Sequence, residues 1–165
     1  MLTSTTQYGN RGKRSEDLIE SVIDKYNQSG QSVIQRVSTP IRKLKGGGFT
    51  YSKKSTVDFV GVAYSRPVAF EVKKTEFSTR FPLSNVSDHQ FSFLKKYHLQ
   101  NGISFLLVEF EKLAEWYVVP FQMLSRWWGC RERESIPHQA FVDEAVRVEP
   151  GGRTGLDFLA FINAE

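Results

Sequence analysis

Apolar residues recur at helical spacing near the start of the chain. Between residues 13 and 28 they lie three and four positions apart, so they share one face of a helix. These residues are Leu18, Ile19, Val22, Ile23 and Tyr26. Gly30 follows as a stop signal. We predict an amphipathic helix over residues 13–28, preceded by a turn at 9–12 and a mobile polar lead at 1–8.

The middle of the chain carries short strand patterns separated by polar turns. Residues 32–37 predict a strand that Pro40 ends, because proline cannot donate to a ladder. Residues 57–64 and 68–73 are rich in β-branched and aromatic side chains, and the link at 65–67 makes them a predicted hairpin. A polar loop is expected to follow at 74–84.

The second half predicts helices on either side of two more strands. Ser87 is the expected N-cap of a helix that runs to about Gln100. Core strands are expected at 103–110 and 116–119, C-terminal helices from Pro120 and from 135–137, a short strand at 146–148 and a helical turn at 157–162. This order predicts a single α/β (α+β) domain over residues 9–165, with helices flanking a central mixed sheet.

Residues 41–54 form a basic, glycine-rich segment with no helical pattern. Its charged and aromatic residues are Arg42, Lys43, Lys45, Phe49, Tyr51, Lys53 and Lys54. We predict a loop or ribbon that projects from the core, and a solvated glycine-rich loop is the alternative.

Composition restricts the class of protein. A chain of 165 residues with 40% hydrophobic content can bury one core. No window is apolar enough for a membrane span, and the polar start does not resemble a secretion signal, so we expect a soluble, cytoplasmic protein. The single cysteine, Cys130, excludes an internal disulfide, and we expect a buried, unreactive thiol.

Charge is distributed unevenly along the chain. Residues 1–100 carry 16 Lys and Arg against 8 Asp and Glu, whereas residues 101–165 carry 6 against 10. A concentrated positive surface attracts a polyanion, so nucleic acid is an expected partner. On charge alone, a solubilising face is an equally good explanation.

Asp58, Glu71 and Lys73 are the candidate chemical residues. Residues two apart in a strand share a face, so Glu71 and Lys73 project together, and Asp58 on the neighbouring arm of the hairpin can meet them. Two carboxylates, aided by the backbone carbonyl of Val72, suit Mg²⁺ or Mn²⁺. Alternating charges are common on exposed strands by chance, but the apolar flanks here indicate core strands, where charged groups are costly unless they gather at a polar site.

An Asp followed about a dozen residues later by Glu-x-Lys resembles the PD-(D/E)xK nuclease superfamily, and within it the RecU-type Holliday junction resolvases. Further motifs resemble that family in the same order over about residues 9–120. They are Gly9-Asn10-Arg11-Gly12 with Glu16, Thr39-Pro40-Ile41, Ser55 to Gly61, Phe70-Glu71-Val72-Lys73, Phe81 to Asn85 with His89-Gln90, and Gly102 to Phe105.

The resemblance implies a restriction-endonuclease-like core and assigns site residues. Asp58 and Glu71 become metal ligands and Lys73 the catalytic lysine, with Thr56 and Gln90 beside the reacting groups. Glu16 would reach the metal through a bound water. For Thr56 the alternative is strand propensity, and for Glu16 it is complementarity to the helix dipole.

The resemblance also gives the basic segment a role as a stalk that enters the centre of a junction. The expected DNA-binding residues are Arg11, Lys13, Arg14, Arg42, Lys43, Lys45, Phe49, Tyr51, Lys53, Lys54, Lys74 and Arg80. The stalk and the N-terminal lead are shorter than is usual in the family, which would suit a compact, phage-encoded member.

The function that the resemblance implies is metal-dependent resolution of four-way branched DNA by paired symmetrical nicks, in recombination and repair. It implies a homodimer, and a recombinase or branch-migration helicase as a further partner. Trp127 and Trp128 are candidates for an interface or for the core. The alternative functions are another PD-(D/E)xK endonuclease acting on duplex or branched DNA, and a non-catalytic DNA-binding recombination accessory.

Overall fold

The computed structural model describes residues 5–38, 41–51, 56–130 and 132–163. Its α-helices are α1 (Thr5–Gln28), α2 (Asp88–Leu99), α3 (Phe121–Trp128), α4 (His138–Glu144) and α5 (Ala160–Asn163), and its 3-10 helices are η1 (Leu83–Asn85) and η2 (Glu111–Leu113). The strands are β1 (Ser32–Arg36), β2 (Ile41–Lys43), β3 (Phe49–Tyr51), β4 (Phe59–Ala63), β5 (Arg66–Thr75), β6 (Arg80–Pro82), β7 (Ile103–Phe110), β8 (Glu115–Pro120), β9 (Ser135–Pro137), β10 (Val146–Val148), β11 (Pro150–Gly151) and β12 (Gly155–Leu156).

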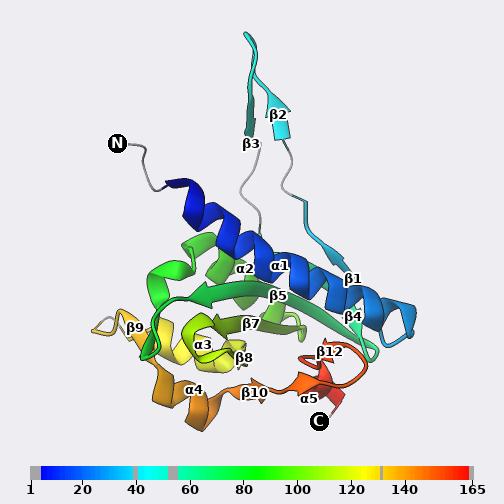
Figure 1. The fold of residues 1–165 in the computed structure, drawn as a ribbon, viewed down its shortest axis with the longest axis vertical. Coiled ribbons are helices and arrows are strands. Elements are labelled where there is room, and N and C mark those ends of the chain that lie inside the picture. Colours follow the sequence, from blue (N-terminus) through cyan, green and yellow to red (C-terminus); the bar gives the residue numbers. More distant parts are fainter. Residues whose placement is uncertain (1–4, 39–40, 52–55, 131, 164–165) are drawn as a thin grey trace.

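Six strands form the central sheet in the order β1-β4-β5-β7-β8-β10 (Figure 1). The pair β5 and β7 is parallel, and the crossover between them contains α2. The other neighbouring pairs of this sheet are antiparallel. The predicted mixed sheet flanked by helices is therefore confirmed.

Each face of the sheet is covered by its own set of helices. Ile19, Val22, Ile23 and Tyr26 of α1 pack in one hydrophobic core with the C-terminal segment and α5, whereas α2, α3 and α4 pack in another. Leu18, predicted to share the apolar face of α1, is 49% exposed instead. Within the first core, Phe70 of β5 stacks between Phe59 and Phe105, with ring centroids 5.1 and 4.7 Å apart. Such pairs add about 1 kcal/mol each beyond the burial of their surface, so β5, which carries Glu71 and Lys73, is packed firmly between β4 and β7.

The predicted hairpin is formed by β4 and β5. Its turn is Tyr64-Ser65, one residue earlier than expected, and both residues have positive φ, as a two-residue hairpin turn requires. Gly61 lets β1 approach β4 closely, because a Cβ at this position would lie 2.1 Å from the carbonyl oxygen of Val33. The register pairs Phe59 with Phe70, so Asp58 and Glu71 are the next residues on the two neighbouring arms of the hairpin.

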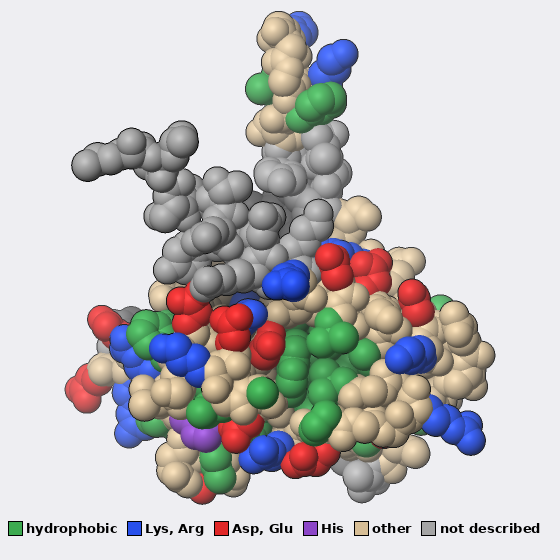
Figure 2. Space-filling model, viewed as in Figure 1, with side chains coloured by type: hydrophobic (Ala, Val, Ile, Leu, Met, Phe, Trp, Pro, Cys, Tyr) green, Lys and Arg blue, Asp and Glu red, His purple; other side chains and the backbone are tan. Residues whose placement is uncertain are grey.

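The basic segment contains a second hairpin, formed by β2 and β3 and called here the stalk hairpin (residues 41–51). It stands away from the sheet in Figure 1. Gly46, Gly47 and Gly48 at its turn all have positive φ, which glycine adopts readily. Lys43 and Lys45 are exposed on this hairpin, and the body below it carries mixed charges (Figure 2). Lys53 and Lys54 lie outside the described residues.

Two predicted helix starts were wrong. Helix α1 begins at Thr5, so the expected turn at 9–12 and part of the expected lead are helical. Extending an existing helix adds a hydrogen bond per residue without a new nucleation cost, which offsets the poor propensity of glycine. Residues 135–137 form strand β9, which pairs with β6 inside the expected polar loop, and α4 begins only after Pro137.

The end of α3 corrects one prediction and bears on another. Trp128 stacks on Phe91 with ring centroids 4.5 Å apart, and both tryptophans are partly buried against the second core, which favours the core alternative for them. Cys130 is exposed, so the prediction of a buried thiol was wrong. The helix has already ended at Trp128, and the chain there runs on the surface. No helix in the described part of the chain is long and apolar enough to span a bilayer.

Candidate active site

The hairpin of β4 and β5 brings Asp58 and Glu71 together. Asp58 lies just before β4, and its Oδ2 accepts a hydrogen bond of 2.8 Å from the backbone N–H of Val72. Its own carbonyl accepts a bond of 2.7 Å from the N–H of Val37, which follows β1. Asp58 is therefore fixed on both sides by neighbouring strands.

Glu71 is the most buried charged group of the site. It is only 3% exposed, and its Oε1 lies 2.7 Å from Nζ of Lys73 on the same face of β5. Its Oε2 is buried and has no hydrogen-bond partner among the described residues. An unsatisfied buried carboxylate oxygen is costly, so this atom is suited to a ligand that the protein chain itself does not supply.

Burial raises the pKa of both carboxyls. The pKa of Glu71 is raised from 4.5 to about 7, mainly by desolvation and also by the charge of Asp58, against the lowering effect of Lys73. For Asp58, desolvation also raises the pKa, while the bond from Val72 and the charge of Lys73 lower it. Burial makes it unfavourable for both carboxyls to be ionised at once. A bound cation would stabilise their ionised forms.

Gln90 connects α2 to this carboxylate. Its Nε2 donates a hydrogen bond to Oε1 of Glu71, and its Oε1 accepts one of 3.0 Å from the backbone N–H of Ser87. The first turn of α2 thereby faces β5 at Glu71.

Glu16 approaches the site from α1 and is held by Arg36. The Arg36 guanidinium at the end of β1 pairs with Glu16, with Asp17 at 3.3 Å and with Glu20 at 3.0 Å. Burial and the charge of Asp58 raise the pKa of Glu16, and Arg36 lowers it. Glu16 is thus close enough to sense Asp58 while its carboxylate is bound to Arg36.

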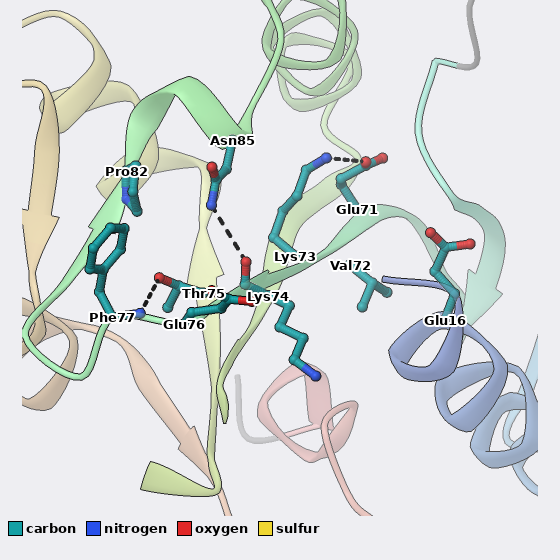
Figure 3. Close-up of a pocket in the computed structure, with 10 residues that line it drawn as sticks. All are labelled: Glu16, Glu71, Val72, Lys73, Lys74, Thr75, Glu76, Phe77, Pro82 and Asn85. Atoms are coloured by element: carbon teal, nitrogen blue, oxygen red, sulfur yellow. Dashed lines mark hydrogen bonds and ion pairs between the residues drawn. The ribbon is translucent and has the colours of Figure 1, made fainter. Parts of the chain in front are cut away.

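A cavity of about 410 Å³ extends from Glu16 past Glu71 and Lys73 to Phe77 and Asn85 (Figure 3). Lys73 and Lys74 leave β5 on opposite sides. Lys74 lies 2.8 Å from Glu111 and 3.9 Å from Glu109, and its side chain is 16% exposed. Its predicted DNA contact would require these ion pairs to open.

Comparisons with known proteins identify the family. Residues 10–164 match the family model RecU, recombination protein U. The chain belongs to the RecU family. It is 33% identical over 167 residues to the Holliday junction resolvase RecU of Leuconostoc citreum (strain KM20), covering 94% of this chain and 82% of that protein. It is 32% identical over 171 residues to the Holliday junction resolvase RecU of Listeria innocua serovar 6a, covering 94% and 84%.

A solved structure supports the fold. The chain superposes on Hjc, a Holliday junction resolvase from Archaeoglobus fulgidus, with a TM-score of 0.50 over 84% of this chain and 94% of that one. The sequences are 16% identical, so this likeness concerns the fold alone. It confirms the restriction-endonuclease-like core.

Membership of a family of resolvase nucleases implies a divalent metal cofactor, and the RecU-type site fits one. Asp58 and Glu71 offer hard oxygen ligands, and the unsatisfied Oε2 of Glu71 is available. Within the described ranges, no three Asp, Glu, His or Cys side chains cluster closely enough to hold a metal by themselves. Remaining positions would therefore fall to backbone carbonyls, water or the substrate.

The other predicted residues of this RecU-family chain are dispersed. Thr56 is exposed, two positions before Asp58. Arg14, Lys43, Lys45 and Arg80 are exposed, and Phe49 is 73% exposed on the stalk hairpin. Arg11 and Lys13 lie in α1, Arg42 in β2 and Tyr51 in β3, with side chains outside the described part. These DNA contacts remain predictions.

Arg36, Phe77 and Asn85 were not predicted as site residues from the sequence. Asn85 donates a bond of 3.4 Å to the carbonyl of Lys74, which fastens η1 to β5 at the cavity. Arg36 could have been noticed as a lone cation at the end of an apolar strand. Its three acidic partners come from α1, and their convergence depends on tertiary packing.

Proposed function

We propose that this chain is a metal-dependent endonuclease that resolves Holliday junctions by paired symmetrical nicks during recombination and repair, with Asp58, Glu71, Lys73 and Gln90 as its reaction centre. The observation that carries the proposal is the buried Glu71 carboxylate. Lys73 and Gln90 bind one of its oxygens. The other oxygen, beside Asp58, is buried and has no hydrogen-bond partner among the described residues.

Asp58 and Glu71 would hold Mg²⁺ or Mn²⁺. Strand pairing supports the carbonyl of Val72 as a third ligand. The N–H of Val72 points to Asp58, and the N–H and C=O of one strand residue point to the same side. The pairing of β4 with β5 ends at Phe59 and Phe70, so no β4 residue pairs with Val72 in this ladder. When bound, the cation supplies positive charge to the phosphodiester and acidifies water for attack.

Lys73 and Gln90 would act on the other side of the carboxylate. Nζ of Lys73 projects into the cavity that Glu71 lines, where it can donate to a phosphate oxygen or orient the attacking water. Gln90 holds Oε1 of Glu71, so the open Oε2 keeps its direction. Glu16 is proposed to act through water, because Arg36 holds its carboxylate.

A homodimer is part of the proposal. Two nicks on opposing strands require two reaction centres related by a two-fold axis, and each chain offers one. A mixed dimer of wild-type and Lys73→Ala chains should nick one strand and leave its counterpart intact. Light scattering of the purified protein gives the oligomeric state directly.

Substrate selectivity tests the proposed function. The purified protein should cut labelled four-way DNA near the crossover with Mg²⁺, and cut a linear duplex of matched sequence far more slowly. Equal cutting of both substrates would favour a general endonuclease of the same superfamily. A junction that is bound but uncut with Mg²⁺ and with Mn²⁺ would favour a non-catalytic accessory protein.

A further inference from the structure

Phe77 is an exposed aromatic residue on the wall of the cavity that contains Glu71 and Lys73. Its side chain is 46% exposed, although it lies in a short loop between β5 and β6. Single exposed apolar side chains are common on protein surfaces. Phe77 is distinguished by its place, because it packs in neither core and lines the cavity that Glu71 and Lys73 also line.

The loop presents this ring in a fixed position. Thr75, only 3% exposed, accepts a hydrogen bond of 3.2 Å from the N–H of Phe77 and donates one of 3.2 Å to the carbonyl of Arg80. Arg80 is also held by the pairing of β6 with β9, and the carbonyl of Thr79 accepts a bond of 2.8 Å from the N–H of His138. Both ends of the loop are therefore anchored to the sheet and to α4.

The guanidinium of Arg80 lies over the Phe77 ring, with Cζ 4.6 Å from the ring centroid. An arginine over one face of a ring keeps the ring ordered and adds positive charge beside it. Lys74, a predicted DNA-binding residue that lines the cavity, is instead engaged with Glu109 and Glu111. Arg80 is exposed and can meet a phosphate while its planar group still covers the ring.

We propose that Phe77 and Arg80 form a stacking platform for one unpaired nucleobase of the strand whose phosphate enters the cavity. The inference rests on the proposed function, because it takes DNA as the substrate. A flat apolar ring beside a cation, continuous with the cavity that would take the scissile phosphate, matches a base and its own phosphate. A base in intact duplex is already stacked on its neighbours, so the platform favours strands opened at a branch.

Photocrosslinking tests this contact directly. Four-way DNA carrying 5-iododeoxyuridine at single positions around the cut site is bound to a Lys73→Ala chain and irradiated. We expect a crosslink to the peptide that contains Phe77, at one position close to the scissile phosphate, and no crosslink at that position with Phe77→Leu in the same background.

Binding and cleavage by matched variants complete the test. Phe77→Leu keeps apolar bulk and should weaken junction binding by about tenfold, whereas Phe77→Tyr keeps the ring and should bind like the wild type. Val142→Ala, which removes an exposed apolar side chain on α4, is the control. Unchanged thermal unfolding of Phe77→Leu excludes a folding defect.

If wild type cleaves junctions but Phe77→Leu binds equally well and no crosslink reaches Phe77, the platform is wrong and the proposed function stands. If wild type cleaves no DNA, the proposed function itself fails.

Discussion

The side-chain amide of Gln90 donates to the buried carboxylate of Glu71 while its oxygen accepts the N–H of Ser87. The second bond fixes the orientation of the amide, so that its NH₂ group faces Glu71. The first turn of α2 thus sets the direction of the Glu71 carboxylate on β5. The position of the Oε2 atom that has no hydrogen-bond partner therefore depends on both elements.

Replacing Gln90 with Ala should therefore reduce cleavage by about 10- to 100-fold, mainly by raising the Mg²⁺ concentration needed for half-maximal rate. The carboxylate would lose the group that holds its Oε1. Calcium binding by calorimetry gives a second measurement that does not depend on turnover.

Gln139 is the matched control for Gln90. It is also a helical glutamine bound to a carboxylate, that of Asp143 at 2.9 Å, but on the exposed surface of α4. Gln139→Ala should leave the Mg²⁺ dependence unchanged. Equal effects of the two substitutions would mean that Gln90 only stabilises the fold.

The pKa of Glu71 predicts how the stability of the metal-free protein depends on pH. Burial raises this pKa from 4.5 to about 7 in the folded chain. Between these values the folded state holds a proton that the unfolded state has released, so stability falls as pH rises through about 7. We expect a loss of about 2 kcal/mol in the free energy of unfolding between pH 5 and pH 8 from this group.

Denaturant unfolding in EDTA across this range measures the effect, and Glu71→Gln is the comparison. The variant should lack most of the pH-dependent loss. Added Mg²⁺ should stabilise the wild type more at pH 8 than at pH 6, because the cation binds the ionised carboxylates. Parallel pH profiles for wild type and variant would contradict the raised pKa.

Much of the site could be predicted from local sequence because a hairpin makes it. The two-residue period of β5 places Glu71 and Lys73 on one face and Lys74 on the other. The proximity of Asp58 and Glu71 could be predicted because a short turn fixes how the two strands pair.

Other features depend on contacts between distant segments. Strands β6 and β9 have three residues each and carry no alternating pattern long enough to reveal their pairing. The contact of Ser15 with Glu109, at 2.6 Å, joins α1 to β7 across the core. The grouping of Glu16, Asp17 and Glu20 around Arg36 likewise depends on how α1 lies on β1.

Arg36 should stabilise the packing of α1 on the sheet. Arg36→Ala removes the cation shared by three carboxylates and should lower the free energy of unfolding by about 1 kcal/mol, a value limited by partial solvent exposure. Arg36→Lys keeps the charge but lacks the planar guanidinium, and it should recover part of the lost stability. Arg126→Ala breaks an exposed pair with Glu144 and should have a smaller effect. If Arg126→Ala costs as much as Arg36→Ala, the cluster has no special role.

The stalk hairpin should contribute to DNA binding through charge. Replacing exposed Lys43 and Lys45 with Ala removes two cations, so the slope of log affinity against log salt should become shallower by about 2. Lys112→Ala, on η2, serves as the control and should leave the slope unchanged. An unaltered slope in the double variant would show that the stalk does not contact phosphates.

The most direct test of the central claim is the single-turnover rate of cutting an end-labelled four-way junction by wild type, Asp58→Asn, Lys73→Ala and the control Lys112→Ala. The account predicts symmetrical nicks near the crossover only with Mg²⁺ or Mn²⁺. Asp58→Asn and Lys73→Ala should lose activity by about 100-fold or more while still binding the junction, and Lys112→Ala should match the wild type. Cutting that persists in EDTA, or in Lys73→Ala at the wild-type rate, would contradict the assignment of this site.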